Sequence, residues 1–208
     1  MNRFLTFEGV EGSGKSTQTT HLAEALTEVG YEVITTREPG GTELGRKLRA
    51  MLLAADAPAP AAETELLLYL ADRAEHLARL VRPALERGAV VLADRFSDST
   101  LAYQAYGRGL DRAQVQRLDA FARGGLMPSR TFLLDLPVEQ GLARARQVGP
   151  ADRLELEKIE FHKRVRAGFH ELAAAEPARF EVLDAREDRT ALATRIAEDV
   201  FSWIGDAK

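Results

Sequence analysis

The chain contains no cysteine among its 208 residues and no long run of apolar residues. The first absence excludes disulfide bonds, zinc knuckles and a cysteine nucleophile. The second excludes a transmembrane helix, which needs about 20 consecutive apolar residues. The N-terminus also lacks an apolar stretch long enough for a signal peptide. We therefore expect a cytoplasmic protein that has no membrane partner.

The chain also lacks a net positive charge. The formal net charge is -4, the sequence pI is about 5.7, and only five residues are lysine. A domain with a basic face for nucleic acid normally has the opposite balance, so we expect no nucleic-acid partner. Most basic residues are arginines, and a single arginine is usually a solvated surface charge. An arginine is therefore a functional candidate only where its position suggests a role.

Asparagine occurs once, as Asn2, which bears on the class of nucleotide-binding protein considered below. The composition is otherwise that of an ordinary globule, with 45% hydrophobic and 29% charged residues. This length fits a single domain, 1–208.

Apolar runs alternate with segments of helical periodicity. This order predicts an α/β fold with a doubly wound, five-stranded parallel sheet and helices on both faces. The expected strands are 4–8, 32–36, 89–93, 131–134 and 180–183. The expected helices are 15–29, 43–53, 64–80, 154–175 and 190–204, with a proline-containing connector at 54–60. Ligands of such sheets bind beyond the carboxyl ends of the strands.

A glycine-rich loop follows the first expected strand. It reads Gly9-Val10-Glu11-Gly12-Ser13-Gly14-Lys15-Ser16, which matches the phosphate-binding pattern G-x-x-x-x-G-K-[ST]. Backbone N–H groups of such a loop surround the phosphates, and the following helix directs its positive end at them. Lys15 is expected to reach the β- and γ-phosphates, and Ser16 to ligate Mg²⁺.

Two features narrow the class of nucleotide-binding protein. A GTPase would need Asn-Lys-x-Asp to read guanine, and the single Asn2 excludes that motif. Asp94 follows a buried apolar strand, where an ATPase or a kinase would hold Mg²⁺, directly or through water. Arg95 comes next and could clamp a second phosphate, which favours a kinase.

Four ordered motifs resemble those of the thymidylate kinase family. They are the loop Gly-x-Glu-Gly-x-Gly-Lys-Ser, the segment Arg37-Glu38-Pro39-Gly40-Gly41, the run Asp94-Arg95-Phe96-x-x-Ser99-x-x-Ala102-Tyr103-Gln104, and Asp152-Arg153. The resemblance covers nearly the whole chain. It implies a P-loop kinase architecture with a short mobile lid at about 141–153.

The resemblance also implies how a thymidine monophosphate acceptor (dTMP) is bound. Arg49 and Arg95 match arginines that hold the acceptor phosphate, with Arg37 and Thr100 in the same region. Tyr69 stands where the family has an aromatic residue, usually phenylalanine, that stacks on thymine. Arg73 matches an arginine that bonds thymine O4, and Gln104 is expected to read the base edge with its amide donor and acceptor. Glu11 matches an acid that contacts the 3'-hydroxyl, and Tyr103 is expected to exclude a 2'-hydroxyl.

The chemistry needs no general base, because the second pKa of a phosphate monoester is about 6 and the acceptor is largely ionised at pH 7. Catalysis is then charge neutralisation and in-line positioning. One branch of the family carries a catalytic arginine in the phosphate loop, where this chain has Gly12, and some relatives have a lid arginine where it has Val148. The catalytic candidates are therefore Lys15, Arg95, Arg146 and Arg153, with Arg144 near ATP.

The resemblance thus predicts transfer of the γ-phosphate of ATP to dTMP, with Mg²⁺, in a homodimer formed through helices 43–53 and 64–80. Three alternatives remain open on the residues alone. They are a nucleoside monophosphate kinase with another base specificity, a deoxynucleoside kinase, and an ATPase switch that regulates a partner.

Overall fold

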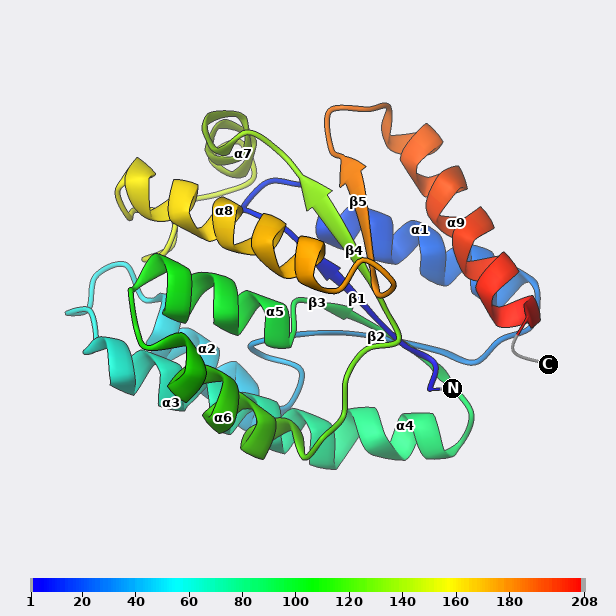
Figure 1. The fold of residues 1–208 in the computed structure, drawn as a ribbon, viewed down its shortest axis with the longest axis horizontal. Helices are drawn as coiled ribbons and strands as arrows, with labels where there is room; N and C mark the ends of the chain where they lie inside the picture. Colours follow the sequence, from blue (N-terminus) through cyan, green and yellow to red (C-terminus); the bar gives the residue numbers. More distant parts are fainter. Residues whose placement is uncertain (1, 207–208) are drawn as a thin grey trace.

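A computed structural model of the protein describes residues 2–206, and it has the predicted five-stranded sheet (Figure 1). All strands are parallel, in the order β2-β3-β1-β4-β5. The strand bounds are β1 Phe4–Glu8, β2 Val33–Arg37, β3 Val90–Asp94, β4 Arg130–Asp135 and β5 Phe180–Asp184. The central strands β3, β1 and β4 are buried on both faces, as their continuous apolar runs predict.

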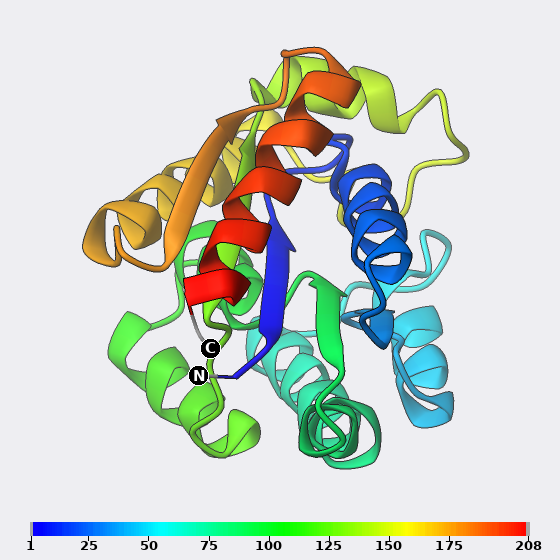
Figure 2. The ribbon, with the colours of Figure 1, turned by 90° about the vertical axis from the view of Figure 1, so that its right-hand side faces the viewer.

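Helices cover both faces of the sheet (Figures 1 and 2). Alternate residues of one strand point to opposite faces. In β1, Leu5 and Phe7 pack on the face covered by α1 and α9, whereas Phe4 packs on the other face. The covering helices of the first face are α1 Lys15–Glu28, α7 Val138–Ala145 and α9 Arg189–Asp206. Those of the second are α3 Ala62–His76, α4 Arg82–Glu86, α6 Arg112–Arg123 and α8 Ile159–Ala175. The doubly wound arrangement is confirmed.

The helix α2, Glu43–Leu53, has the predicted bounds. The Thr42 hydroxyl accepts a hydrogen bond from the Gly45 N–H at 2.9 Å and so caps its N-terminus. The next predicted helix, 64–80, is longer than expected. It runs from α3 through a wide π-helical turn, η1 Leu77–Val81, into α4, which has Pro83 in its first turn. Pro83 has no N–H, so the continuous helix lacks one hydrogen bond just after this wide turn.

The segment 97–123 is helical, although we predicted no helix there. It comprises α5 Ser97–Thr100, the π-helix η2 Leu101–Gly107 and α6. All four residues of α5 are buried in spite of their polar side chains. A polar segment in the interior gives no hydrophobic periodicity, so the sequence carried no signal for α5.

The predicted helix 154–175 begins later than we expected, at Ile159. The Asp152 carboxylate accepts hydrogen bonds from the backbone N–H groups of Leu154 and Glu155 at 2.9 and 3.0 Å. These bonds hold residues 152–155 in a turn, which replaces the first turns of the predicted helix. Among residues 2–206, no helix has the length and hydrophobicity of a membrane span.

Candidate active site

The glycine-rich loop joins β1 to α1, as the pattern requires. The Lys15 ammonium donates hydrogen bonds to the carbonyls of Gly9 and Val10 at 3.1 and 2.8 Å, so it lies inside the curve of the loop. Burial, together with the nearby Arg95 guanidinium, lowers the pKa of Lys15 to about 8. The amine therefore carries its charge at neutral pH, where it can meet an anionic ligand.

The loop packs against the helix α7 through two glycines. Gly12 has a φ of +66°, and a Cβ at this position would lie 2.1 Å from the Gly141 carbonyl oxygen. Conversely, a Cβ on Gly141 would lie 2.4 Å from the Glu11 carbonyl oxygen. Neither distance is possible for real atoms, so both positions require glycine in this arrangement. The phosphate loop thus rests directly on the backbone of α7.

The two predicted metal ligands lie together. The Ser16 hydroxyl at the start of α1 donates a hydrogen bond of 2.5 Å to a carboxylate oxygen of Asp94, the last residue of β3. Oxygen ligands of this kind suit Mg²⁺, which usually takes few protein ligands and completes its shell with phosphate and water oxygens. Residues 2–206 contain no cluster of three or more His, Asp or Glu side chains that could hold a metal alone. The donor set fits Mg²⁺ bound together with a nucleotide.

A cavity of about 320 Å³ adjoins this pair. All nine residues predicted to bind the acceptor line it, although they come from five separate stretches of the chain. They are Glu11, Arg37, Arg49, Tyr69, Arg73, Arg95, Thr100, Tyr103 and Gln104. Lys15, Ser16 and Asp94 line the same cavity, so the phosphate loop and the acceptor candidates share one space.

Three guanidinium groups make one end of this cavity strongly positive. Arg95 has a backbone φ of +73°, which costs a non-glycine residue about 1–2 kcal/mol. This conformation is compatible with hydrogen bonds from its side chain to the Gly9 carbonyl at 3.0 Å and the Ser99 hydroxyl at 3.1 Å. Arg49 donates to the Pro39 carbonyl at 3.1 Å. Burial, followed by repulsion from Arg37, lowers the pKa of Arg49. An anion placed among these groups relieves that repulsion.

Glu11 is the acid of this region. The Tyr103 hydroxyl donates a hydrogen bond to Glu11 Oε1, and Arg95 donates to the same oxygen at 3.3 Å. Burial opposes ionisation of Glu11, but its neighbours His162, Arg95, Lys15 and Tyr103 together outweigh burial and lower its pKa to about 2. The carboxylate is therefore a charged acceptor of hydrogen bonds at neutral pH.

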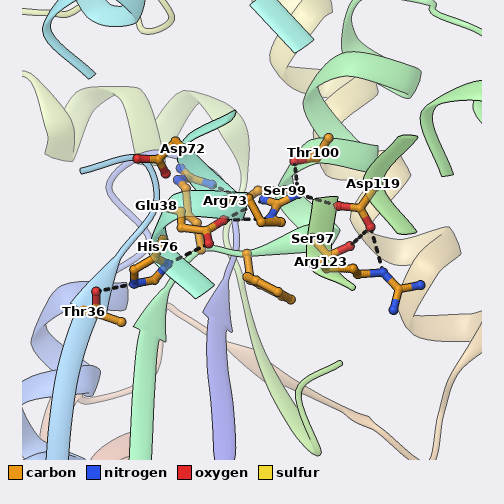
Figure 3. A network of polar contacts seen from close by, with 12 residues as sticks. Thr36, Glu38, Asp72, Arg73, His76, Ser97, Ser99, Thr100, Asp119 and Arg123 are labelled. Atoms are coloured by element: carbon orange, nitrogen blue, oxygen red, sulfur yellow. Dashed lines mark hydrogen bonds and ion pairs between the residues drawn. The ribbon is translucent and has the colours of Figure 1, made fainter. Parts of the chain in front are cut away.

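Arg73 lies at the centre of a buried polar network (Figure 3). Its Nε donates to Glu38 Oε2 at 2.9 Å, and its Nη1 donates to Asp119 Oδ1 at 2.5 Å and to the Thr100 hydroxyl at 2.8 Å. Burial opposes ionisation of Glu38, but Arg73 and His76 outweigh it and lower the Glu38 pKa. The guanidinium is thus fixed on two sides by carboxylates while it still lines the cavity.

The network continues from Glu38 to His76 (Figure 3). His76 Nδ1 lies 2.8 Å from Glu38 Oε1, and its Nε2 lies 2.7 Å from the Thr36 hydroxyl. Because an ionised carboxylate can only accept, Nδ1 carries the hydrogen. Asp72 accepts the Gly40 N–H at 3.1 Å, and burial, with the nearby Glu38 charge, raises the Asp72 pKa to about 6. These contacts attach the loop after β2 to α3.

Gln104 is held in place by a buried acid. Its amide nitrogen donates one hydrogen bond to the Glu65 carboxylate at 3.0 Å. This bond fixes the orientation of the amide and leaves one N–H and the amide oxygen without that partner, because the amide nitrogen carries two hydrogens. That Gln104 reads a base through donor and acceptor together stays a prediction.

The three arginines of the predicted lid are in different environments. Arg153 is buried, and it donates to the Leu52 carbonyl at 2.7 Å and to Glu65 Oε2 at 2.6 Å. It is thus held beside Gln104, and it does not line the cavity that holds Lys15. Arg144 donates to the Ala185 carbonyl at 3.0 Å. Arg146 is exposed, and its guanidinium has no hydrogen-bond partner within residues 2–206. The placement of Arg153 disagrees with a role as a mobile lid donor.

Sequence reasoning missed the residues that hold the predicted ones in place, namely Glu38, Glu65, His76, Asp119 and His162. Glu38 belongs to a motif that we noted, and His76 follows Arg73 by three positions on the same helix. Either fact could have suggested a partner for Arg73. Asp119 and His162 carry no local signal, because their contacts are 46 and 151 positions away in the chain.

Comparison with known proteins agrees with the geometry. A family model described as thymidylate kinase matches residues 7–196. The thymidylate kinase of Solidesulfovibrio magneticus is 53% identical over 209 residues, which cover 97% of this chain and 98% of that protein. The thymidylate kinase of Geobacter sulfurreducens is 50% identical and covers 98% of this chain and 99% of its own. The crystal structure of thymidylate kinase from Ehrlichia chaffeensis superposes with a TM-score of 0.78 at 33% identity, over 95% of this chain and 97% of that one.

Proposed function

This chain belongs to the thymidylate kinase family, and we propose that it transfers the γ-phosphate of ATP to dTMP, giving thymidine diphosphate for dTTP synthesis. One observation carries the proposal. A single cavity joins the phosphate loop to a pocket with the arginines, aromatic ring and amide oxygen that a thymidine monophosphate needs.

The acceptor phosphate binds among Arg37, Arg49 and Arg95, where three positive charges surround the cavity. It arrives largely as the dianion, so its oxygen attacks the γ-phosphate without a protein base. The Lys15 ammonium neutralises charge on the transferring group, and Arg95 holds the attacking oxygen in line. The loop N–H groups from Gly9 to Ser16 hold the phosphates of ATP.

Ser16 and Asp94 would hold Mg²⁺, Asp94 directly or through water. When bound, the ion would supply positive charge to neutralise the phosphates of ATP. The 2.5 Å hydrogen bond between the two side chains supports this assignment, since it places two hard oxygen ligands at the mouth of the loop.

The far end of the cavity reads the nucleoside. Tyr69 stacks on thymine, and Arg73 donates to O4 beside Thr100. The Gln104 amide oxygen accepts the thymine N3–H, and the bond from its nitrogen to Glu65 holds the amide in place. Cytosine presents a donor at C4 and an acceptor at N3, and it would meet both groups with the wrong polarity. Glu11 accepts the 3'-hydroxyl, and the buried Tyr103 ring excludes a 2'-hydroxyl.

The segment 141–153 acts as a lid, and Arg146 is the favoured catalytic donor within it. Arg146 is the exposed arginine of this segment whose side chain makes no hydrogen bond within residues 2–206. Arg144 borders the ATP site from the last turn of α7. Arg153 serves the acceptor side, where it orients Glu65.

The chain acts as one domain in the cytoplasm and forms a homodimer. Exposed apolar side chains on α2 and α3 support the dimer, and they include Leu44, Met51 and Leu67. No membrane or nucleic-acid partner is proposed.

A coupled ATPase assay with a panel of nucleosides and monophosphates tests the activity. We expect turnover with dTMP, weak turnover with deoxyuridine monophosphate and none with deoxycytidine monophosphate. Equal turnover with several bases would indicate a broader monophosphate kinase, and turnover with free nucleosides a deoxynucleoside kinase. Hydrolysis independent of any acceptor would indicate an ATPase switch.

A further inference from the structure

His162 is a buried histidine that the proposed reaction does not use. It lies in the first turn of α8 and is fully inaccessible to solvent. The Phe161 ring packs edge-on against it, with the ring centroids 5.4 Å apart. Neither ring nitrogen has a hydrogen-bond partner within residues 2–206. Burial of unpartnered imidazole nitrogens is costly, so a purely apolar side chain would suit the core better here.

On its Nδ1 side, His162 approaches an acid of the candidate active site. Nδ1 lies 3.3 Å from Glu11 Oε2, close enough for an ion pair but not aligned as a hydrogen bond. That oxygen is itself buried and unpartnered. The other oxygen of Glu11 already accepts from Tyr103 and Arg95. The two orphaned atoms therefore face each other across a short gap.

We propose that His162 is a positioning residue for Glu11. With hydrogen on Nδ1, the ring directs Oε2 and so fixes the plane of the carboxylate, while Tyr103 and Arg95 fix Oε1. One carboxylate oxygen can accept two hydrogen bonds, so Oε2 retains a lone pair for a sugar hydroxyl of the acceptor. His162 thus acts through Glu11 to favour acceptors that carry a 3'-hydroxyl. This inference rests on the proposed function.

The test compares two substitutions of similar size. In His162→Asn the amide nitrogen stands near the position of Nδ1 and keeps a donor, whereas His162→Leu removes it. A hydrogen bond to a charged group contributes about a ten- to hundredfold effect. We expect His162→Leu to lower kcat/KM for dTMP by about that factor, to leave KM for ATP within a few-fold, and His162→Asn to restore most of the loss.

The second readout is 3'-deoxythymidine monophosphate, used as a substrate or as a competitive inhibitor. It has no 3'-hydroxyl, so its kcat/KM or Ki should be nearly equal in wild type and His162→Leu. If His162→Leu handles dTMP as wild type does, or loses both acceptors equally, the inference is wrong. Should the leucine variant not fold, His162→Gln replaces it, since its amide reaches the Nε2 position. Equal 3'-hydroxyl preference in the Asn and Gln variants would then overturn the inference. Absence of wild-type turnover with dTMP would instead refute the proposed function.

Discussion

Arg73→Ala should destabilise the protein as well as impair base recognition. Its side chain is only 2% exposed, and it is paired with Glu38 at 2.8 Å and Asp119 at 2.5 Å. Removing one partner of a buried ion pair costs about 3–5 kcal/mol, because a charge is left uncompensated. Here Glu38 keeps His76 and Asp119 keeps Arg123, so we expect the lower end, about 3 kcal/mol. For a chain of 208 residues this lowers Tm by roughly 6–12 °C.

Thermal unfolding followed by circular dichroism measures this loss, and Arg123→Ala is the matched control. Arg123 also pairs with Asp119, at 3.1 Å, but its side chain is 20% exposed and Asp119 would keep Arg73. We expect the control to lose at most about 1 kcal/mol. Below the transition of Arg73→Ala, kcat/KM for dTMP should fall while KM for ATP is unchanged. A Tm equal to that of the control would refute the argument from buried charge, and a fall in ATP affinity without a change in base preference would refute the base-reading role.

Three further predictions concern the sugar preference, the catalytic arginine and a buried acid. Tyr103→Ala should relax the preference for deoxyribose over ribose acceptors, whereas Tyr103→Phe should keep it; unchanged discrimination in Tyr103→Ala would reject a steric role. Arg146→Ala should lower the single-turnover rate by about 10³-fold or more with little change in ATP or dTMP binding, whereas Arg153→Ala should mainly lower stability; similar single-turnover rates in Arg146→Ala and wild type would exclude Arg146 as the donor. Burial, then the nearby Asp98, raises the pKa of Glu8 to about 8, so the folded state binds a proton more tightly than the unfolded one and stability falls as pH rises from about 4.5 to 8. Glu8→Gln should flatten this part of the curve in urea titrations, and an unchanged slope would contradict the raised pKa.

Local sequence patterns were sufficient to predict most of the fold. The apolar runs of β1, β3 and β4 and the loop before Lys15 are each readable from fewer than ten neighbouring residues, and the structure confirms them. The boundary at Ile159 could not be read in this way. It depends on Asp152, whose side chain captures the N–H groups that a longer helix would use.

The residues of the candidate site also fall into two groups, those that local motifs predict and those that they do not. Residues expected to touch ligand occur in short motifs, and the structure brings all of the acceptor candidates to one cavity. Residues that support them are joined by contacts between distant parts of the chain. Asp119 meets Arg73 across 46 positions, and Glu65 fixes the orientation of Gln104 across 39. A polar residue within a helix does not reveal such a partner before the helices are packed.

The contact between Gly12 and Gly141 constrains how a chain of this kind can change over evolutionary time. An arginine at position 12 would bring its Cβ to 2.1 Å from the Gly141 carbonyl, so the substitution fails even if the new charge would assist catalysis. The helix α7 must first move away from the loop, and that step alone offers no catalytic gain. If the catalytic arginine lies in the lid, as we propose, a loop arginine is an alternative solution that an unfavourable intermediate separates from it. The close packing of Gly12 on Gly141 would then favour keeping the arginine in the lid.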